Sequence, residues 1–271
     1  MTILITGATG LVGARLLPRL IAQGVPCKAL LRSGKAAPDG CQAVEGDLLD
    51  PATLAEALTG ASTIIHLAAV FRTPDTDLIW KSNLEGTCNL IDAAKAHAPD
   101  ARLIMASTSL VYDKDAGRPG RETDRSEPVQ AYPASKLAAE AALKSSGLTW
   151  SILRFSFVYG DGDGHLETLP KLAVQAGFHP AQRMSMIHHR DIAVAITLAL
   201  DGAMDRRIVN LVDEAPMSLF ELCELVGEAM APSAEPLAYP WYMQADGTLA
   251  RRLGFRPSVR TVYQAVEESL M

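Results

Sequence analysis

The first 31 residues carry the pattern that most restricts how this chain can fold. An apolar, β-branched run at 2–6 passes directly into the glycine-rich segment Gly7-Ala-Thr-Gly10-Leu-Val-Gly13. Apolar residues then recur at helical spacing until about Gly24, and a second apolar run fills 26–31. Such a strand–turn–helix–strand unit buries its strands in a parallel sheet beneath the helix. The pattern predicts the α/β class, with a Rossmann-type doubly wound parallel sheet.

The glycines of this turn predict a dinucleotide site. Glycine lets the turn tighten and lets the backbone approach a pyrophosphate at the N-terminus of the following helix. The spacing G-x-x-G-x-x-G differs from the G-x-G-x-x-G of many dehydrogenases, and a glycine triplet also fits an ordinary turn. Its place between a strand and an amphipathic helix favours the cofactor site. The turn residues expected to contact the cofactor are Gly7, Thr9, Gly10, Leu11 and Val12.

Arg32 follows the second expected strand and bears on the choice of cofactor. In NAD-selective sites an acidic residue at this position accepts the ribose 2′-hydroxyl. Here the position is Arg, and Lys35 follows closely. Arginine pairs well with a 2′-phosphate, so the sequence predicts a preference for NADP(H) over NAD(H). The alternative is a solvated loop arginine without a role.

Two further strand ends complete the expected cofactor site. The third expected strand, 42–46, is followed by Asp47, whose carboxylate can meet an adenine amino group. The fourth, 62–69, ends in small residues that leave room for a cofactor to lie across it. His66 stands within that apolar strand and is expected to be a packed core histidine, not a catalyst. The additional expected contacts are Asp47, Leu48, Leu67, Ala68 and Ala69.

Tyr132 and Lys136 are the candidate catalytic pair. They stand four residues apart at the start of an expected helix, 132–146, and therefore share one face. A phenol with a pKa of about 10 is a poor acid or base at neutral pH. We expect the ammonium and the helix N-terminus to lower the pKa of Tyr132, which makes it a general acid/base. Tyr-x-x-x-Lys also occurs by chance on exposed helices.

Several motifs occur in an order that resembles one family. The chain resembles the extended short-chain dehydrogenase/reductase family, also called the NAD-dependent epimerase/dehydratase family, from Thr2 to about Leu270. The motifs are Gly7/Gly10/Gly13, Asp47-Leu48, His66-Leu-Ala-Ala69, Asn83-x-x-Gly86-Thr87 and Tyr132-x-x-x-Lys136.

The resemblance implies roles for further residues. The family's hydroxyl residue would be Thr108, which hydrogen-bonds the substrate oxygen that gains or loses charge. Ser107 and Ser109 are close competitors. Lys136 would also hold the ribose, and Asn83 would shape the cofactor loop near the active site. Two residues after the sixth expected strand, 149–154, would lie near the nicotinamide, namely Phe155 and Val158.

The resemblance also implies an assembly and a second lobe. The helices around 75–97 and 131–147 would pair with a second subunit in a four-helix bundle, giving a homodimer. Residues 1–160, together with about 187–212, would form the cofactor domain. A small C-terminal substrate lobe would take 161–186 and 213–271.

One segment of that C-terminal region carries adjacent histidines, His188 and His189. Neighbouring strand residues alternate faces, so only one histidine is expected to point inward and no metal site is predicted. Asp191 is expected to cap the helix that runs to Leu200.

The sequence is compatible with three functions. The first is hydride transfer between NADP(H) and a secondary alcohol or ketone of a small substrate. The second is a nucleotide-sugar epimerase, and the third a non-enzymatic NADP-sensing protein. Such sensors usually lose the Tyr/Lys pair, which is present here. The family's dehydratases and decarboxylases place an acid after the Ser/Thr, where this chain has Ser109 and Leu110. Many epimerases carry an arginine where it has Met184, so we favour the reductase.

Composition excludes other classes. The net charge is −6 with acids and bases mixed along the chain, unlike a basic nucleic-acid-binding face. No apolar run reaches the roughly 18 residues of a membrane span, and no signal peptide is visible. The four cysteines are scattered without metal-ligand spacing, which fits free thiols in a reducing cytosol. We therefore expect a soluble, cytoplasmic protein that binds neither membrane nor nucleic acid.

Overall fold

A computed structural model of the protein describes residues 2–36 and 38–271. Within this part of the chain, a seven-stranded sheet has the order β10-β6-β5-β4-β1-β2-β3, and every neighbouring pair is parallel. Its strands are β1 (Ile3–Thr6), β2 (Cys27–Leu31), β3 (Gln42–Glu45), β4 (Thr63–His66), β5 (Arg102–Thr108), β6 (Thr149–Phe155) and β10 (Arg207–Leu211). The strand order reverses between β1 and β4, which is where ligands bind in doubly wound sheets. The predicted fold class is confirmed.

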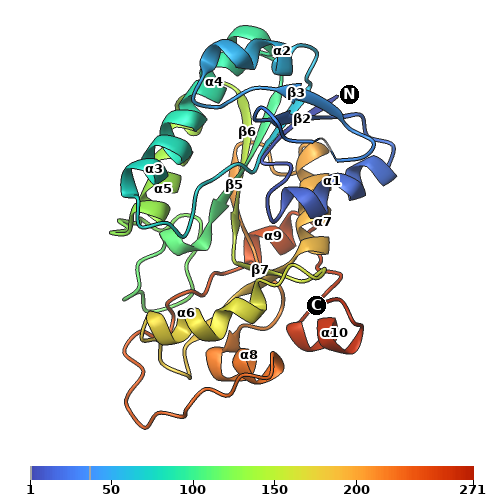
Figure 1. Ribbon diagram of the computed structural model, residues 1–271. Helices are drawn as coiled ribbons and strands as arrows, with labels where there is room; N and C mark the ends of the chain where they lie inside the picture. The colour runs from blue at the N-terminus through green and yellow to red at the C-terminus, as the bar shows by residue number, and fades with distance from the viewer. Residues whose placement is uncertain (1, 37) are drawn as a thin grey trace.

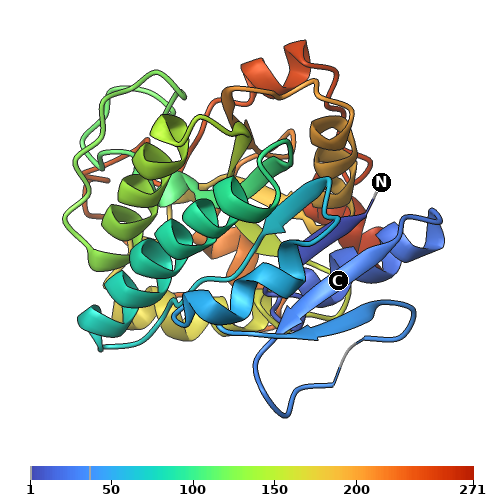
Figure 2. The same ribbon diagram turned by 90° about the horizontal axis from the view of Figure 1, so that it is seen from above.

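Helices cover both faces of the sheet (Figures 1 and 2). On one face α1 (Gly13–Ala22) packs with α7 (His189–Leu200); on the other α4 (Gly86–His97) packs with α5 (Ala131–Ser145) beside α2 (Leu54–Leu58). Strand β1 serves both layers, because Ile3 and Ile5 face α1 while Leu4 faces α2. Burial on both faces explains why the strands read as continuous apolar runs.

The helix expected over 75–97 forms with an interruption. Asp75 caps α3 (Thr76–Trp80) by accepting a hydrogen bond from the Leu78 amide at 2.9 Å. A π-helical turn, Lys81–Glu85, then leads into α4. Such turns widen the helix by one residue and are frequent at functional sites. Here the wider turn carries the fully buried Asn83.

The C-terminal part has its own apolar cluster below the sheet in Figure 1. It contains β7 (Phe157–Tyr159) beside β9 (Met186–His188), β8 (Arg183–Met184) beside β11 (Met217–Ser218), and helices α6 (Leu169–Gln175), α8 (Leu219–Leu225) and α10 (Val262–Glu267). Helix α9 (Thr248–Arg252) differs, because Ala250 and Phe255 pack in the cluster that contains α1 and α7. Short 3₁₀ turns are Pro51–Thr53, Ser109–Val111 and Leu166–Thr168. In the described chain no helix combines the length and apolarity needed to cross a bilayer.

The start of α7 differs from the prediction. Asp191 does not cap the helix; His188 does, since its Nδ1 accepts a hydrogen bond from the Arg190 amide at 3.1 Å. Asp191 lies in the first turn, fully buried, and accepts hydrogen bonds from Ser258 Oγ at 2.7 Å and the Val259 amide at 3.2 Å. The carboxylate therefore fastens the segment before α10 to α7.

Both adjacent histidines are buried, so the expectation that only one points inward was wrong. The strand ends at His188 and the helix begins at His189, and strand alternation does not hold across that junction. The Nε2 of His188 bonds the Leu270 carbonyl at 2.9 Å, and that of His189 bonds Asp163 at 2.8 Å.

Candidate active site

A cavity of about 520 Å³ lies over the carboxyl ends of β1, β2 and β4, at the point where the strand order reverses. It has the size of a small-ligand site. Of the residues predicted from the sequence to contact a cofactor, its lining contains Gly7, Thr9, Gly10, Leu11, Val12, Arg32, Asp47, Leu48, Leu67, Ala68 and Ala69. Asn83, Tyr132, Lys136, Phe155 and Val158 do not line it.

The glycine-rich turn is packed so closely that it excludes side chains. Gly7 has a φ of +72°, and a Cβ there would lie 2.6 Å from the Ala68 amide nitrogen. A Cβ on Gly13 would overlap the carbonyl oxygen of Gly7. The Gly10 amide donates to that same oxygen at 3.0 Å. The turn therefore presents bare backbone at the N-terminus of α1, which suits a pyrophosphate.

Two cations stand at one end of the cavity. Arg32 and Lys35 follow β2, are exposed, and both belong to the lining. At the neighbouring strand end, the Asp47 carboxylate accepts a hydrogen bond from the Leu49 amide at 2.9 Å. The Asp47 amide donates to Thr53 Oγ1, also at 2.9 Å, which fixes this corner of the cavity.

His66 is a structural residue of the core, as predicted. It is fully buried, with Nδ1 at 2.7 Å from Thr6 Oγ1 and Nε2 at 2.9 Å from Thr87 Oγ1. Thr87 donates its hydroxyl proton to the Asn83 carbonyl, so it accepts from His66 Nε2. Burial, with the charge of Lys136 as a second cause, lowers the pKa of His66 to about 3. The neutral ring joins β1, β4 and α4.

Asn83 connects the cavity to the start of α5. Its Oδ1 accepts from the Val70 amide at 2.7 Å, and its Nδ2 donates to the Val70 carbonyl at 3.0 Å. The same amide group donates to Ser135 Oγ at 3.1 Å, and Ser135 donates to the Tyr132 carbonyl. Val70 belongs to the cavity lining. Asn83 therefore fixes the loop after β4 beside the two predicted catalytic residues.

Tyr132 and Lys136 occupy the first turns of α5. The Phe71 ring lies against the Tyr132 ring, with centroids 4.2 Å apart. The Lys136 side chain is nearly buried, at 2% exposure, and its ammonium forms no hydrogen bond with the residues that the structure describes. Burial lowers the pKa of Lys136 to about 8. The negative charge of Glu140 acts in the opposite direction, because it favours the ammonium.

The pKa of Tyr132 differs from the prediction. Burial raises the pKa of Tyr132 to about 12. The prediction that Lys136 lowers this pKa was therefore wrong for the chain alone. The spacing of four residues places both side chains on one face, but it does not report how far desolvation opposes the charged phenolate.

The comparison with known proteins decides the family. Residues 3–211 match the model of the NAD dependent epimerase/dehydratase family. The chain belongs to this family. The predicted recognition as an extended short-chain dehydrogenase/reductase is confirmed, and so is the prediction of an enzyme.

Two relatives are distant in sequence but match over most of their length. A 4-hydroxy-2-methyl-3-oxo-4-farnesyl-3,4-dihydroquinoline-1-oxide ketoreductase of Stigmatella aurantiaca is 29% identical, covering 87% of this chain and 75% of its own. A dTDP-6-deoxy-L-talose 4-dehydrogenase (NAD(P)(+)) of Kitasatospora kifunensis is 28% identical, covering 97% and 93%.

Solved structures establish the fold. MoeE5 in complex with UDP-glucuronic acid and NAD superposes with a TM-score of 0.81 at 24% identity, covering 99% of both chains. The Bordetella bronchiseptica enzyme WbmG in complex with NAD and UDP has a TM-score of 0.79 at 24% identity, covering 98% and 94%.

Membership of the epimerase/dehydratase family implies a nicotinamide cofactor, and the residues present fit one. The glycine turn offers bare backbone, the cavity has cations at one end, and Lys136 keeps a nearly buried ammonium with free donors. The described residues contain no group of three His, Cys, Asp or Glu side chains placed to hold a metal ion.

Sequence reasoning missed the network beneath Lys136. Glu140 accepts from Ser107 Oγ at 2.5 Å and from both the Nε and Nη2 of Arg154. Arg154 also donates to the Tyr112 hydroxyl, which donates to Asn210. Glu140 stands four residues after Lys136, so the helical spacing that joined Tyr132 to Lys136 also reaches it.

The remaining predicted residues lie on β5, β6 and β7. Thr108 closes β5, is 6% exposed, and accepts from the Leu110 amide at 3.1 Å. Phe155 closes β6, and Val158 lies in β7, where its carbonyl is 2.7 Å from His165 Nδ1. All three are buried.

Proposed function

We propose that this enzyme is an NADP(H)-dependent reductase that interconverts a ketone or aldehyde and the corresponding alcohol of a small substrate. The observation that carries the proposal is the pair on α5. Lys136 keeps a nearly buried ammonium without a hydrogen-bond partner among the described residues, one turn from the aromatic hydroxyl of Tyr132. The Nζ of Lys136 is not among the fully buried polar atoms, so the ammonium reaches the surface, where a ligand can accept its hydrogen bonds.

The roles follow from the chemistry of each side chain. A bound nicotinamide nucleotide would supply the hydride for carbonyl reduction, or accept it in the reverse direction. With a pKa of about 12, Tyr132 stays protonated at neutral pH and can donate its hydroxyl proton to the carbonyl oxygen. Lys136 would hold the ribose hydroxyls.

Thr108 is our candidate for binding the reacting oxygen. Its Oγ1 accepts one hydrogen bond, from Leu110, which leaves its own proton to donate. Of the two competitors, Ser107 already donates its proton to Glu140. Donors aimed at an oxygen that gains charge lower the barrier of carbonyl reduction.

Arg32 and Lys35 support the preference for NADP(H). Both stand at the end of β2 within the cavity lining, where the ribose 2′ position lies in dinucleotide folds. A 2′-phosphate offers them charge-assisted hydrogen bonds that a hydroxyl does not. The relatives named above include a ketoreductase and a dehydrogenase described for NAD(P)(+).

A nucleotide-sugar epimerase is the second candidate. The UDP-glucuronate 4-epimerase 1 of Arabidopsis thaliana is 32% identical, covering 59% of this chain and 43% of its own. Such an enzyme is redox-neutral over its cycle and must keep its cofactor between turnovers. A reductase must exchange its nucleotide after each turnover.

The experiment uses this difference. Denaturing the purified protein and assaying the released nucleotide should yield little NAD(P)⁺, and the protein should oxidise added NADPH in the presence of carbonyl compounds. Stoichiometric release of NAD(P)⁺, with no NADPH oxidation, would instead indicate the epimerase.

We also propose a homodimer through α3, α4 and α5, and a substrate lobe built mainly from 161–186 and 213–271. Trp80 at the end of α3 is 38% exposed, which is unusual for so large an apolar ring. Sedimentation should give twice the chain mass, and Trp80→Glu should shift the protein toward the monomer.

A further inference from the structure

Arg72 spans two segments that are far apart in sequence. It follows β4 and has a φ of +58°, in the left-handed region that non-glycine residues seldom adopt. Its Nη2 lies 2.6 Å from His165 Nε2, and its Nη1 donates to Thr168 Oγ1 at 3.4 Å. The guanidinium thus connects the loop after β4 to the start of the C-terminal cluster. The Arg72 side chain is exposed to solvent.

His165 is arranged to receive this cation as a neutral ring. Its Nδ1 lies 2.7 Å from the Val158 carbonyl, which can only accept, so Nδ1 carries the proton and Nε2 accepts from Arg72. Burial lowers the pKa of His165, and the nearby positive charge of Arg72 acts in the same direction. The ring also stacks on Phe157 with centroids 4.4 Å apart.

Arg72 is linked to the proposed catalytic tyrosine through the Phe71 ring. Its guanidinium stands over the Phe71 ring, 5.3 Å from the centroid, and Phe71 packs on Tyr132. On its other side, His165 bonds Val158, a residue that we expect near the nicotinamide. The contacts of Arg72 therefore lead through Phe71 to the proposed proton donor, and through His165 to a residue expected near the nicotinamide.

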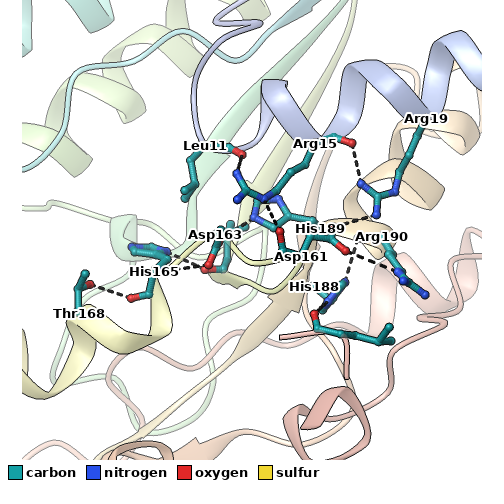
Figure 3. A network of polar contacts seen from close by, with 12 residues as sticks. Leu11, Arg15, Arg19, Asp161, Asp163, His165, Thr168, His188, His189 and Arg190 are labelled. Carbon is teal, nitrogen blue, oxygen red and sulfur yellow. Dashed lines mark hydrogen bonds and ion pairs between the residues drawn. The ribbon is translucent and has the colours of Figure 1, made fainter. Parts of the chain in front are cut away.

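Arg72 has no carboxylate partner in the described part of the chain, unlike Arg19 and Arg190. In Figure 3, Arg19 and Arg190 face the Asp161 carboxylate, at 2.8 and 3.6 Å, and Arg15 donates to the carbonyls of Leu11 and Asp161. Arg72 forms no ion pair with a carboxylate in the described part of the chain, and burial alone lowers its pKa.

The nearest acid in this network is already engaged. Asp163 accepts from His189 Nε2 and from the His165 amide, both at 2.8 Å (Figure 3). A guanidinium has five N–H donors. Two of those of Arg72 are used by His165 and Thr168, so three remain for a ligand while the bridge between the segments persists.

We propose that Arg72 binds a carboxylate of the carbonyl substrate, which makes the substrate an oxo acid. A planar carboxylate matches the free edge of the guanidinium and forms charge-assisted hydrogen bonds with it. Arg72 is thus a cation without a carboxylate partner among the described residues, in a protein whose net charge is −6. The inference rests on the proposed reductase, because it assigns the substrate class for that reaction.

The test compares oxo acids with their methyl esters as substrates for NADPH oxidation, for the wild type, Arg72→Ala, Arg72→Lys and a control, Arg260→Ala. Arg260 is an exposed arginine paired with Glu214. The wild type should prefer the acids. Arg72→Ala should lower kcat/KM for the acids about tenfold or more, the loss of one charge-assisted contact. Its effect on the esters should be far smaller than its effect on the acids, because the esters carry no carboxylate. Arg72→Lys should retain part of the activity toward acids, and Arg260→Ala should match the wild type.

Other outcomes overturn the inference. An equal loss for acids and esters in Arg72→Ala would mean that Arg72 only joins the two segments. A wild type that reduces esters and neutral ketones but not acids would leave the reductase standing without the carboxylate site.

A binding measurement separates the two proposals. In the presence of saturating NADP⁺, oxo acids should raise the Tm of the wild type and not that of Arg72→Ala. If this occurs without turnover of any carbonyl compound, the carboxylate site stands and the proposed reductase fails. If acids shift neither Tm, the carboxylate site is wrong.

Discussion

Glu140 accepts two hydrogen bonds from Arg154, at 2.9 Å from Nε and 2.7 Å from Nη2, one helical turn beyond Lys136. The two side chains are only 2% and 3% exposed. Ser107 on β5 donates to the same carboxylate. The pair therefore fixes α5 against β5 and β6, and with it the positions of Lys136 and Tyr132.

Glu140→Ala should strongly destabilise the protein. It leaves the buried Arg154 guanidinium without its carboxylate, and breaking one partner of a buried pair costs about 3–5 kcal/mol. Urea unfolding should report this loss, whereas Glu56→Ala, at an exposed position of α2, should stay near wild type. A loss below about 1 kcal/mol for Glu140→Ala would contradict the account.

The sheet could be read from the sequence because its strands are buried on both faces. Runs such as 2–6 and 102–106 are almost continuously apolar, which is typical of strands buried on both faces. The glycine turn marks the connection from the first strand to the first helix. The pattern therefore located the strands β1 to β6 along the chain, and the structure gives their order in the sheet. The C-terminal helices were harder to predict. The apolar pattern predicts a helix near 219–230, but α8 ends at Leu225 and a positive φ at Gly227 follows it.

The missed features depend on tertiary contacts. Asp191 has the local signature of a cap, but its partners Ser258 and Val259 lie more than 60 residues away. Glu140 and Arg154 meet only because β5 and β6 are neighbours under α5. Likewise, the spacing of Tyr132 and Lys136 predicted a shared face but not their desolvation, which sets both pKa values.

Arg32→Ala should reduce the discrimination between NADPH and NADH. If Arg32 contacts the 2′-phosphate, the ratio of the two dissociation constants should fall about 10- to 150-fold, the equivalent of one charge-assisted contact. Fluorescence titration with each nucleotide gives both constants. Lys28→Ala is the matched control, because Lys28 lies on β2, which Arg32 follows, but donates to the Thr59 carbonyl and does not line the cavity. An unchanged ratio in Arg32→Ala would remove the basis for the NADP(H) preference.

Lys136 should make cofactor binding pH-dependent. Its pKa is lowered to about 8, so the ammonium is present at pH 7 and is lost as the pH rises through about 8. If the charged form binds the ribose, the dissociation constant for NADPH should rise between pH 7 and pH 9.5, and Lys136→Met should show no such rise. A wild-type constant that stays flat over this range would exclude the role.

The lowered pKa of Lys136 affects folding in the opposite direction: the free energy of unfolding rises with pH where cofactor binding weakens. Unfolded Lys136 has the ordinary pKa of about 10.4 and binds its proton more tightly than the folded form. Between about pH 8 and 10.4, this residue therefore contributes a free energy of unfolding that rises with pH. Comparing the pH dependence of unfolding in wild type and Lys136→Met isolates that contribution.

The most direct measurement of the central claim is NADPH oxidation by Tyr132→Phe with a carbonyl substrate that the wild type reduces. The substitution removes the proton donor and keeps the ring that packs on Phe71. The account predicts a fall in kcat of about 10²- to 10⁴-fold, with an unchanged dissociation constant for NADPH. A kcat within about tenfold of wild type, a barrier change of only 1.4 kcal/mol, would contradict it.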